Sequence, residues 1–327
     1  MTFHWEKLDL RLGLSYTIIA VVFLILYGST GPVWMVAGIS ALLAWVIVLL
    51  GEPASWRAEI AGLALFLGFG IAASLVAHML AAYEIPRVLG LGLFTFGAIL
   101  LLRFGAYWYI VGWCLTFWYL LTPLFSLSLG LGETLEGHVI GAGGLLLYGL
   151  GKRFWHEAAS PEAPGEGAGL IPFAQVIPYA TTVAIVMAIS VFIGGRTLES
   201  DPTIIAAAAL NVISPSSDQT WEAVLLRAIS VGVGVLIGFG LGLWFPTAVA
   251  EQAVFVTCSF ITVATIRLSF GPAVGCFAAI TAFPWGSQGY EIGNAIANEK
   301  LLAEFVGIMI AGIGITILAR LARGRLR

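Results

Sequence analysis

Long apolar runs, separated by short polar segments, fill almost the whole chain. A helix needs about 20 apolar residues to cross a bilayer, and most of the runs approach this length. We predict about twelve membrane helices, at residues 12–27, 32–50, 56–81, 88–102, 107–125, 135–150, 177–193, 202–213, 223–245, 247–266, 271–283 and 301–321.

One stretch of the pattern occurs twice. Residues 57–70 read RAEIAGLALFLGFG, and residues 227–240 read RAISVGVGVLIGFG. Many identical residues in this region share one offset of 170 positions, which indicates an internal duplication. The matched pairs are Pro32 and Pro202, Glu52 and Glu222, Arg57 and Arg227, Gly62 and Gly232, Gly68 and Gly238, and Gly70 and Gly240.

The two copies are joined by an acidic segment rich in Pro and Gly, EAASPEAPGEGAG, at residues 157–169. Such a composition is typical of a flexible linker. We therefore predict a first six-helix membrane repeat at residues 1–156, a linker at 157–172 and a second six-helix repeat at 173–327.

Composition places the chain in a membrane. Hydrophobic residues make up 60% of it and charged residues only 10%, whereas a soluble domain is about 25% charged. The net charge of -3 gives no reason to expect a nucleic-acid partner. Cys114, Cys258 and Cys276 all lie in apolar runs without metal-binding spacing. We expect no metal and no cofactor.

Basic residues predict the orientation. With the termini and every even-numbered connection on one side, that side carries twelve of the 15 Lys and Arg residues, which places it in the cytoplasm. The other side carries Arg87, Arg196 and Lys300. An even number of helices per repeat gives both repeats the same orientation. The predicted fold is an all-α membrane protein whose parallel repeats are related by a pseudo-two-fold axis along the membrane normal.

Glycines and arginines are the main features of the duplicated stretch. Glycines in membrane helices let backbones approach closely, and this is the interpretation for Gly62, Gly68, Gly70, Gly232, Gly234, Gly238 and Gly240. Four arginines precede matching helices in the two repeats, and they are Arg57, Arg227, Arg103 and Arg267. They either mark cytoplasmic helix ends or form Arg–Glu pairs that hold turns, or they face one another and attract an anion.

Ionisable residues within the runs are few. His78, His138 and Glu304 are candidates for carrying a coupled proton, and Asn211 for lining a polar cavity. His78, His138 and Glu304 lie near predicted helix ends, where a position at the lipid headgroups is an equal alternative. Trp113 and Trp118 lie deeper, and either stack on an aromatic ligand or, as we favour, pack against their surroundings.

Several further motifs accompany the two six-helix halves. They are Pro32-Val33-Trp34, an Arg before a Gly-rich third helix, Arg103-x-x-x-Tyr107 and VIGAGGLLLYGLG in the sixth helix. In these features the chain resembles the fusaric acid resistance protein-like, or aromatic acid exporter, superfamily. The resemblance implies export of aromatic and other organic acids. Plant aluminium-activated malate channels are similar, more distantly, and imply anion roles for the four arginines. The chain departs from many members by lacking a soluble domain and by having Thr203-Ile204 where the first half has Val33-Trp34.

The predicted function is a secondary transporter in the bacterial inner membrane, with both termini cytoplasmic, that exports small organic carboxylates in exchange for protons. A passive anion channel and a non-transporting scaffold are the alternatives. No catalytic motif is present, so we do not expect an enzyme. The expected partners are the organic anion and the bilayer. The fused halves allow a monomeric pseudo-dimer, and a homo-oligomer stays open.

Overall fold

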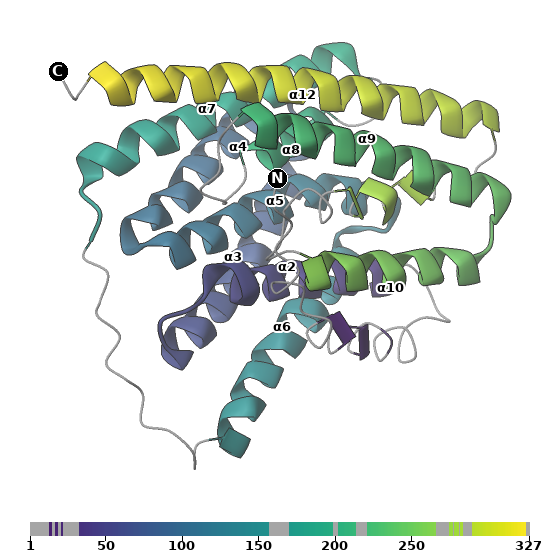
Figure 1. The fold of residues 1–327 in the computed structure, drawn as a ribbon, viewed down its shortest axis with the longest axis horizontal. Helices are drawn as coiled ribbons and strands as arrows, with labels where there is room; N and C mark the ends of the chain where they lie inside the picture. The colour runs from purple at the N-terminus through teal and green to yellow at the C-terminus, as the bar shows by residue number, and fades with distance from the viewer. Residues whose placement is uncertain are drawn as a thin grey trace. The chain divides into compact units, whose positions relative to one another are not determined.

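The computed structural model describes residues 13–14, 17–18, 21, 33–156, 170–198, 202–213, 221–265, 275–276, 278–280, 282–283 and 290–324. Within these ranges, the side chains of residues 127–128, 152–156, 211–212, 221–224, 227, 290–297, 300 and 318–324 are not described. All secondary structure in the described ranges is helical (Figure 1). Packing divides the chain into two compact units, unit 1 (Met1–Leu26 with Ile189–Arg327) and unit 2 (Tyr27–Ala188).

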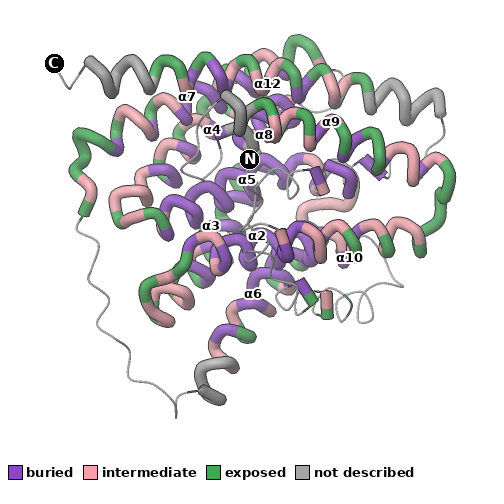
Figure 2. The backbone as a smooth tube through the Cα atoms, viewed as in Figure 1, coloured by how far each residue is buried: buried purple, intermediate pink, exposed green. Residues whose placement is uncertain are grey.

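Unit 2 is built from consecutive helices and holds the candidate site. Its elements are α2 (Val33–Gly51), α3 (Trp56–Ala81), α4 (Glu84–Ile99), the 3-10 helix η2 (Leu100–Phe104), α5 (Ala106–Ser128), α6 (Leu131–His156) and the first part of α7 (Phe173–Thr197). Helix α5 packs against α2, α3 and α4, and α6 packs against α2 and α3. Burial in unit 2 is concentrated on α2 and α5 (Figure 2).

Unit 1 contains the end of α7, then α8 (Thr203–Val212), α9 (Trp221–Trp244), α10 (Ala248–Thr265) and α12 (Tyr290–Gly324). Helix α12 packs against α8 and α9. Gly307 of α12 meets the backbone of α8 at Ile205, and Gly137 of α6 meets the backbone of α2 at Val33. These two glycines are also 170 positions apart. Each unit therefore has a close helix contact at the offset of the duplicated stretch.

Six of the described helices are long and apolar enough to cross a membrane, and they are Val33–Gly51, Trp56–Ala81, Glu84–Phe104, Ala106–Ser126, Phe173–Thr197 and Ala248–Thr265. Shorter apolar helices cover Ala228–Trp244 and Leu301–Ile317. The all-α class is confirmed, and the long apolar helices are compatible with a membrane-embedded protein. Twelve spans and a parallel repeat remain predictions.

Helix boundaries agree with the sequence for α2 and α3 and less well for α4, α6 and the C-terminal helix. The predicted third helix matches α3 at both ends. The last helix begins at Tyr290 rather than at residue 301, because its polar first turns resemble a loop in sequence. The linker at 157–169 and most of helix 12–27 lie outside the described residues.

Two short connections position the ends of α3 and α5. Ser55 caps α3, where its hydroxyl accepts a hydrogen bond from the Ala58 amide at 3.2 Å. Gly105 joins η2 to α5 with φ of 111°, a conformation that glycine adopts at little cost. Because this joint is one residue long, η2 and its Arg103 are held directly at the start of α5.

Candidate functional site

His138 lies in the interior of unit 2, on α6, with no exposed surface. Three neighbouring helices surround it, α2 through Ser40, α3 through Phe66 and Leu67, and α5 through Trp118. We call His138 and these four residues the histidine cage. His138 is therefore enclosed by its neighbouring helices and is not exposed on the surface of unit 2.

Aromatic rings form two walls of the cage. The Trp118 ring stacks on the imidazole with centroids 4.3 Å apart and planes 25° apart. The Phe66 ring meets it edge-on at 5.2 Å. The face of an indole ring carries negative potential and attracts a cation placed over it. The Trp118 wall can therefore stabilise a charged imidazole as well as pack against a neutral one.

Both ring nitrogens of His138 have polar neighbours. Nε2 lies 3.3 Å from the Leu67 carbonyl oxygen, which can only accept, so Nε2 is the donor in this contact. Nδ1 lies 2.8 Å from the Ser40 hydroxyl oxygen. In the neutral ring, Ser40 donates to Nδ1. In the charged ring, Nδ1 donates to Ser40, whose own hydrogen turns to the His138 carbonyl oxygen at 3.4 Å. Rotation of one hydroxyl thus accommodates either protonation state.

Gly70 leaves room for the imidazole ring of His138 because it has no side chain. A Cβ atom at this position of α3 would overlap with Nε2 of His138. Gly68, two positions earlier, has no atom within 4 Å of an added Cβ. The two glycines look alike in sequence, but only Gly70 is required by the cage.

A chain of buried hydrogen bonds extends from the cage. Trp118 Nε1 donates to the Ser74 hydroxyl at 2.9 Å, and Ser74 donates to the Gly70 carbonyl at 2.9 Å. Ser74 also lies 3.2 Å from the Thr122 hydroxyl, which donates to the Trp118 carbonyl at 3.1 Å. Unpaired polar groups are costly in an apolar interior. This network therefore fixes the Trp118 ring against His138.

Arg57 and Arg103 lie at one end of unit 2. Tyr107, in the first turn of α5, donates to the Glu59 carbonyl of α3 at 3.3 Å and fills the space beside Gly51 and Gly62. The starts of α3 and α5 therefore lie together. From Arg57 to Gly70, thirteen residues along α3, the helix rises about 20 Å. The arginine end is separated from the cage by roughly this distance.

Neither guanidinium group forms an ion pair with a carboxylate among the described residues. Arg57 is exposed, with its central carbon 5.5 Å from the Trp56 ring centroid. Arg103 is half-buried and lies 3.6 Å over the Phe173 ring. Its Nη1 is buried and has no hydrogen-bond partner among the described residues. Arg57 and Glu52 lie in the same described part of the chain but form no ion pair with each other. The structure therefore contains no Arg57–Glu52 pair that would hold this turn.

Neither His78 nor Glu304 belongs to the histidine cage. His78 is exposed in the last turn of α3. Glu304 is 6% exposed in unit 1 and lies well inside α12, not near its start as expected. The side chains of Arg227 and Asn211 are not described, and Arg267 lies outside the described residues. Whether the four arginines face one another is thus still a prediction.

Sequence reasoning missed most of the polar partners of His138. It assigned Trp118 to packing, which is correct, but did not pair it with His138. It did not single out Ser40, Ser74 or Thr122. One signal was available, since Ser40 is the only hydroxyl-bearing residue of α2. A lone hydroxyl in an apolar span must find a partner inside the protein, and here the partner is the candidate histidine.

Comparison with protein-family models, curated proteins and solved structures finds no match for this chain. Among the described residues, no group of three or more His, Cys, Asp or Glu side chains is placed to hold a metal.

Proposed function

We propose that this protein is a bacterial inner-membrane transporter that exports small organic carboxylate anions, aromatic ones included, in exchange for protons. The observation that carries the proposal is the histidine cage. An ionisable side chain inside a membrane helix bundle is a strong candidate for a functional group. The cage adds hydrogen-bond partners for both protonation states of that group. The resemblance to organic-acid exporters supports the same function.

The anion site is proposed at the arginine end of unit 2. A guanidinium group offers a planar pair of donors that matches the two oxygens of a carboxylate. Nη1 of Arg103, which has no hydrogen-bond partner in the described part of the chain, is such a donor. Arg57 lies at the same end and adds positive charge. By the duplication, Arg227 and Arg267 are proposed to supply the equivalent groups from the second repeat.

The direction of exchange follows from charge. A proton that enters and a carboxylate that leaves both move down an inside-negative potential. Each charge gains about 2.3 kcal/mol per 100 mV, so an exchange of one for one gains about 4.6 kcal/mol at that potential.

The proposal is tested by transport in proteoliposomes with a panel of aromatic and aliphatic carboxylates, with and without a proton gradient. We expect uphill accumulation of at least one panel member that disappears when the gradient is dissipated. Flux that only follows the anion's own gradient would instead indicate a passive channel. Absence of flux for every panel member, with correctly inserted protein, would contradict transport of this substrate class.

The arginine end makes a separate prediction. Arg103→Ala should raise the KM for the transported carboxylate about 10- to 100-fold, since hydrogen bonds to charged groups contribute about 1.5–3 kcal/mol. Arg103→Lys should give a smaller increase, because the charge remains and the planar fork is lost. Concentration dependence of initial flux in proteoliposomes measures both.

Arg196→Ala is the matched control for this prediction. Arg196 is an exposed arginine in the last turn of α7, on the opposite predicted side of the membrane from Arg103. Its replacement should leave the KM unchanged. Equal effects of the two alanine variants would place the anion site elsewhere and leave only a general electrostatic role for Arg103.

A further inference from the structure

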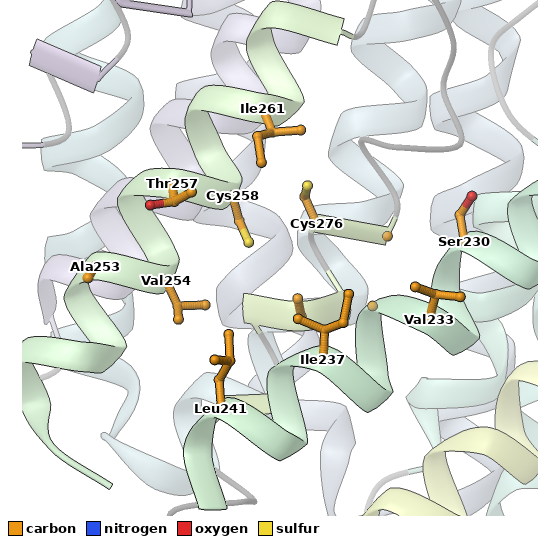
Figure 3. A pocket seen from close by; sticks show the side chains of 13 residues that line it. Ser230, Val233, Ile237, Leu241, Ala253, Val254, Thr257, Cys258, Ile261 and Cys276 are labelled. Atoms are coloured by element: carbon orange, nitrogen blue, oxygen red, sulfur yellow. The ribbon is translucent and has the colours of Figure 1, made fainter. Parts of the chain in front are cut away.

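Unit 1 contains a cavity of about 500 Å³ between α9, α10 and the residues Gly275, Cys276 and Ala279 (Figure 3). Most of its lining is aliphatic, for example Val233, Ile237 and Val254. Ser230 and Thr257 contribute hydroxyl groups. Two of the three cysteines of the chain also line it, and neither is used by the proposed transport function.

Cys258 and Cys276 enter the cavity from different segments. Cys258 projects from α10 and Cys276 from the 275–276 turn of helix, into the same space (Figure 3). The two side chains thus face one common space from opposite sides of the cavity (Figure 3). Both thiols are free, and both residues are partly exposed. The sequence separates them by two predicted helix boundaries, so only the fold makes them neighbours.

The position of Cys276 is fixed by α9. Close backbone contacts hold the 275–279 segment on this helix, where Gly234 meets Gly275 and Gly238 meets Ala279. A small hydrophobic cluster continues the same contact and consists of Val231, Val235, Ala278 and Ala282. Cys276 is thus presented on a segment packed against α9, while Cys258 belongs to α10 on the other side of the cavity.

We propose that Cys258 and Cys276 form a dithiol site that a two-electron thiol oxidant converts to a disulfide, which links α10 to the 275–279 segment across the cavity. Thiol pairs within reach of each other are oxidised stepwise through an adduct or mixed disulfide. The apolar lining admits a neutral, lipid-permeable oxidant and excludes a charged one.

With an azodicarboxamide as oxidant, the reaction is balanced. One sulfur adds to a nitrogen of the N=N bond and its proton passes to the other nitrogen. The second sulfur then attacks the first, so that the S–S bond forms and the S–N bond breaks. The remaining thiol proton ends on nitrogen. The two thiols lose two electrons and two hydrogens, and the azo group is reduced to the hydrazine.

Cys114 serves as an internal control. It is fully buried on α5 in unit 2, and its thiol donates to the Leu43 carbonyl at 3.6 Å. It faces no second thiol among the described residues. An oxidant that reacted with any thiol would modify Cys114 as readily as Cys258 and Cys276. The proposed site predicts instead that only Cys258 and Cys276 are oxidised.

The test treats the purified full-length protein in lipid nanodiscs with an azodicarboxamide, unfolds it without reductant and alkylates the remaining thiols. Mass spectrometry should find one alkylated cysteine, Cys114, and a peptide pair joined through Cys258 and Cys276. Cys114→Ser should form the same link and show no alkylation. Cys258→Ser should show two alkylated cysteines after the same treatment.

Three alkylated cysteines in the oxidised wild-type protein would overturn the proposal, as would a link that includes Cys114 or joins two copies of the chain. The readout is chemical and does not depend on transport. Failure of the proposed transport function and failure of the dithiol site are therefore distinguished.

Discussion

Replacement of His138 by glutamine should abolish proton-driven accumulation of the transported anion. The glutamine side chain can donate to the Leu67 carbonyl and pair with Ser40, as the imidazole does. It cannot take up a proton near neutral pH. We expect uphill transport in proteoliposomes to fall to the level of protein-free vesicles, while downhill exchange of labelled anion persists.

His78→Gln is the matched control for His138→Gln. His78 is the exposed histidine at the end of α3 and lies outside the cage. Its replacement should leave coupling unchanged. Uphill transport by His138→Gln at the wild-type rate would show that the proton is carried elsewhere.

Ser40→Ala provides a second way to test the cage if His138→Gln folds poorly. The variant removes the hydroxyl that lies 2.8 Å from Nδ1 and leaves the histidine in place. The pH profile of transport should shift, because one protonation state loses its partner. An unchanged profile in a folded Ser40→Ala protein would contradict a proton-carrying role for the cage.

The second large effect is expected at Gly70. A Cβ atom at this position overlaps with the His138 ring, and overpacking of a buried site costs about 1–3 kcal/mol. Gly70→Ala should therefore lower the free energy of unfolding by about this amount and also displace the imidazole from Ser40. Thermal unfolding in detergent, together with proton-driven transport, measures both consequences.

Gly68→Ala, on the same helix, is not expected to destabilise the protein. No atom lies within 4 Å of its added Cβ, and alanine is favoured over glycine in a helix interior by up to about 1 kcal/mol. The midpoint of thermal unfolding should stay level or rise. Equal destabilisation by Gly68→Ala and Gly70→Ala would mean that α3 faces its neighbours differently from the arrangement described above.

The contrast between Gly68 and Gly70 shows where sequence reasoning stops. Both belong to the duplicated stretch and both were interpreted as packing glycines. Residues two apart on a helix point about 200° away from each other, so one faces the cage and the other does not. Their counterparts differ again, because Gly238 meets the backbone at Ala279 and Gly240 has open space around it. Periodicity predicts the helix, but not its rotation against neighbours.

The sequence places His138 near a helix end because it predicts the start of this helix too late. The sequence predicts that its helix begins at residue 135, but α6 begins at Leu131. An extra turn corresponds to a rise of about 5.4 Å. This shift, with packing against α2 and α3, moves the histidine from a predicted helix end to the interior. The choice of His138 as a candidate was possible from sequence alone, whereas its partners depend on contacts between residues as much as 98 positions apart.

The deep burial of α5 has a consequence for biosynthesis. Among the six candidate spans it is the least apolar and the most buried, and it carries the polar groups of Trp118 and Thr122. Such a segment inserts poorly when lipid is its only neighbour. Its contacts with Ser74 of α3 and Leu43 of α2 involve helices that leave the ribosome earlier. We expect α5 to insert efficiently behind α2–α4 and poorly alone, as glycosylation-based insertion assays would measure. Because α2–α4 are synthesised before α5, they are already in place to provide the contact surface that α5 needs.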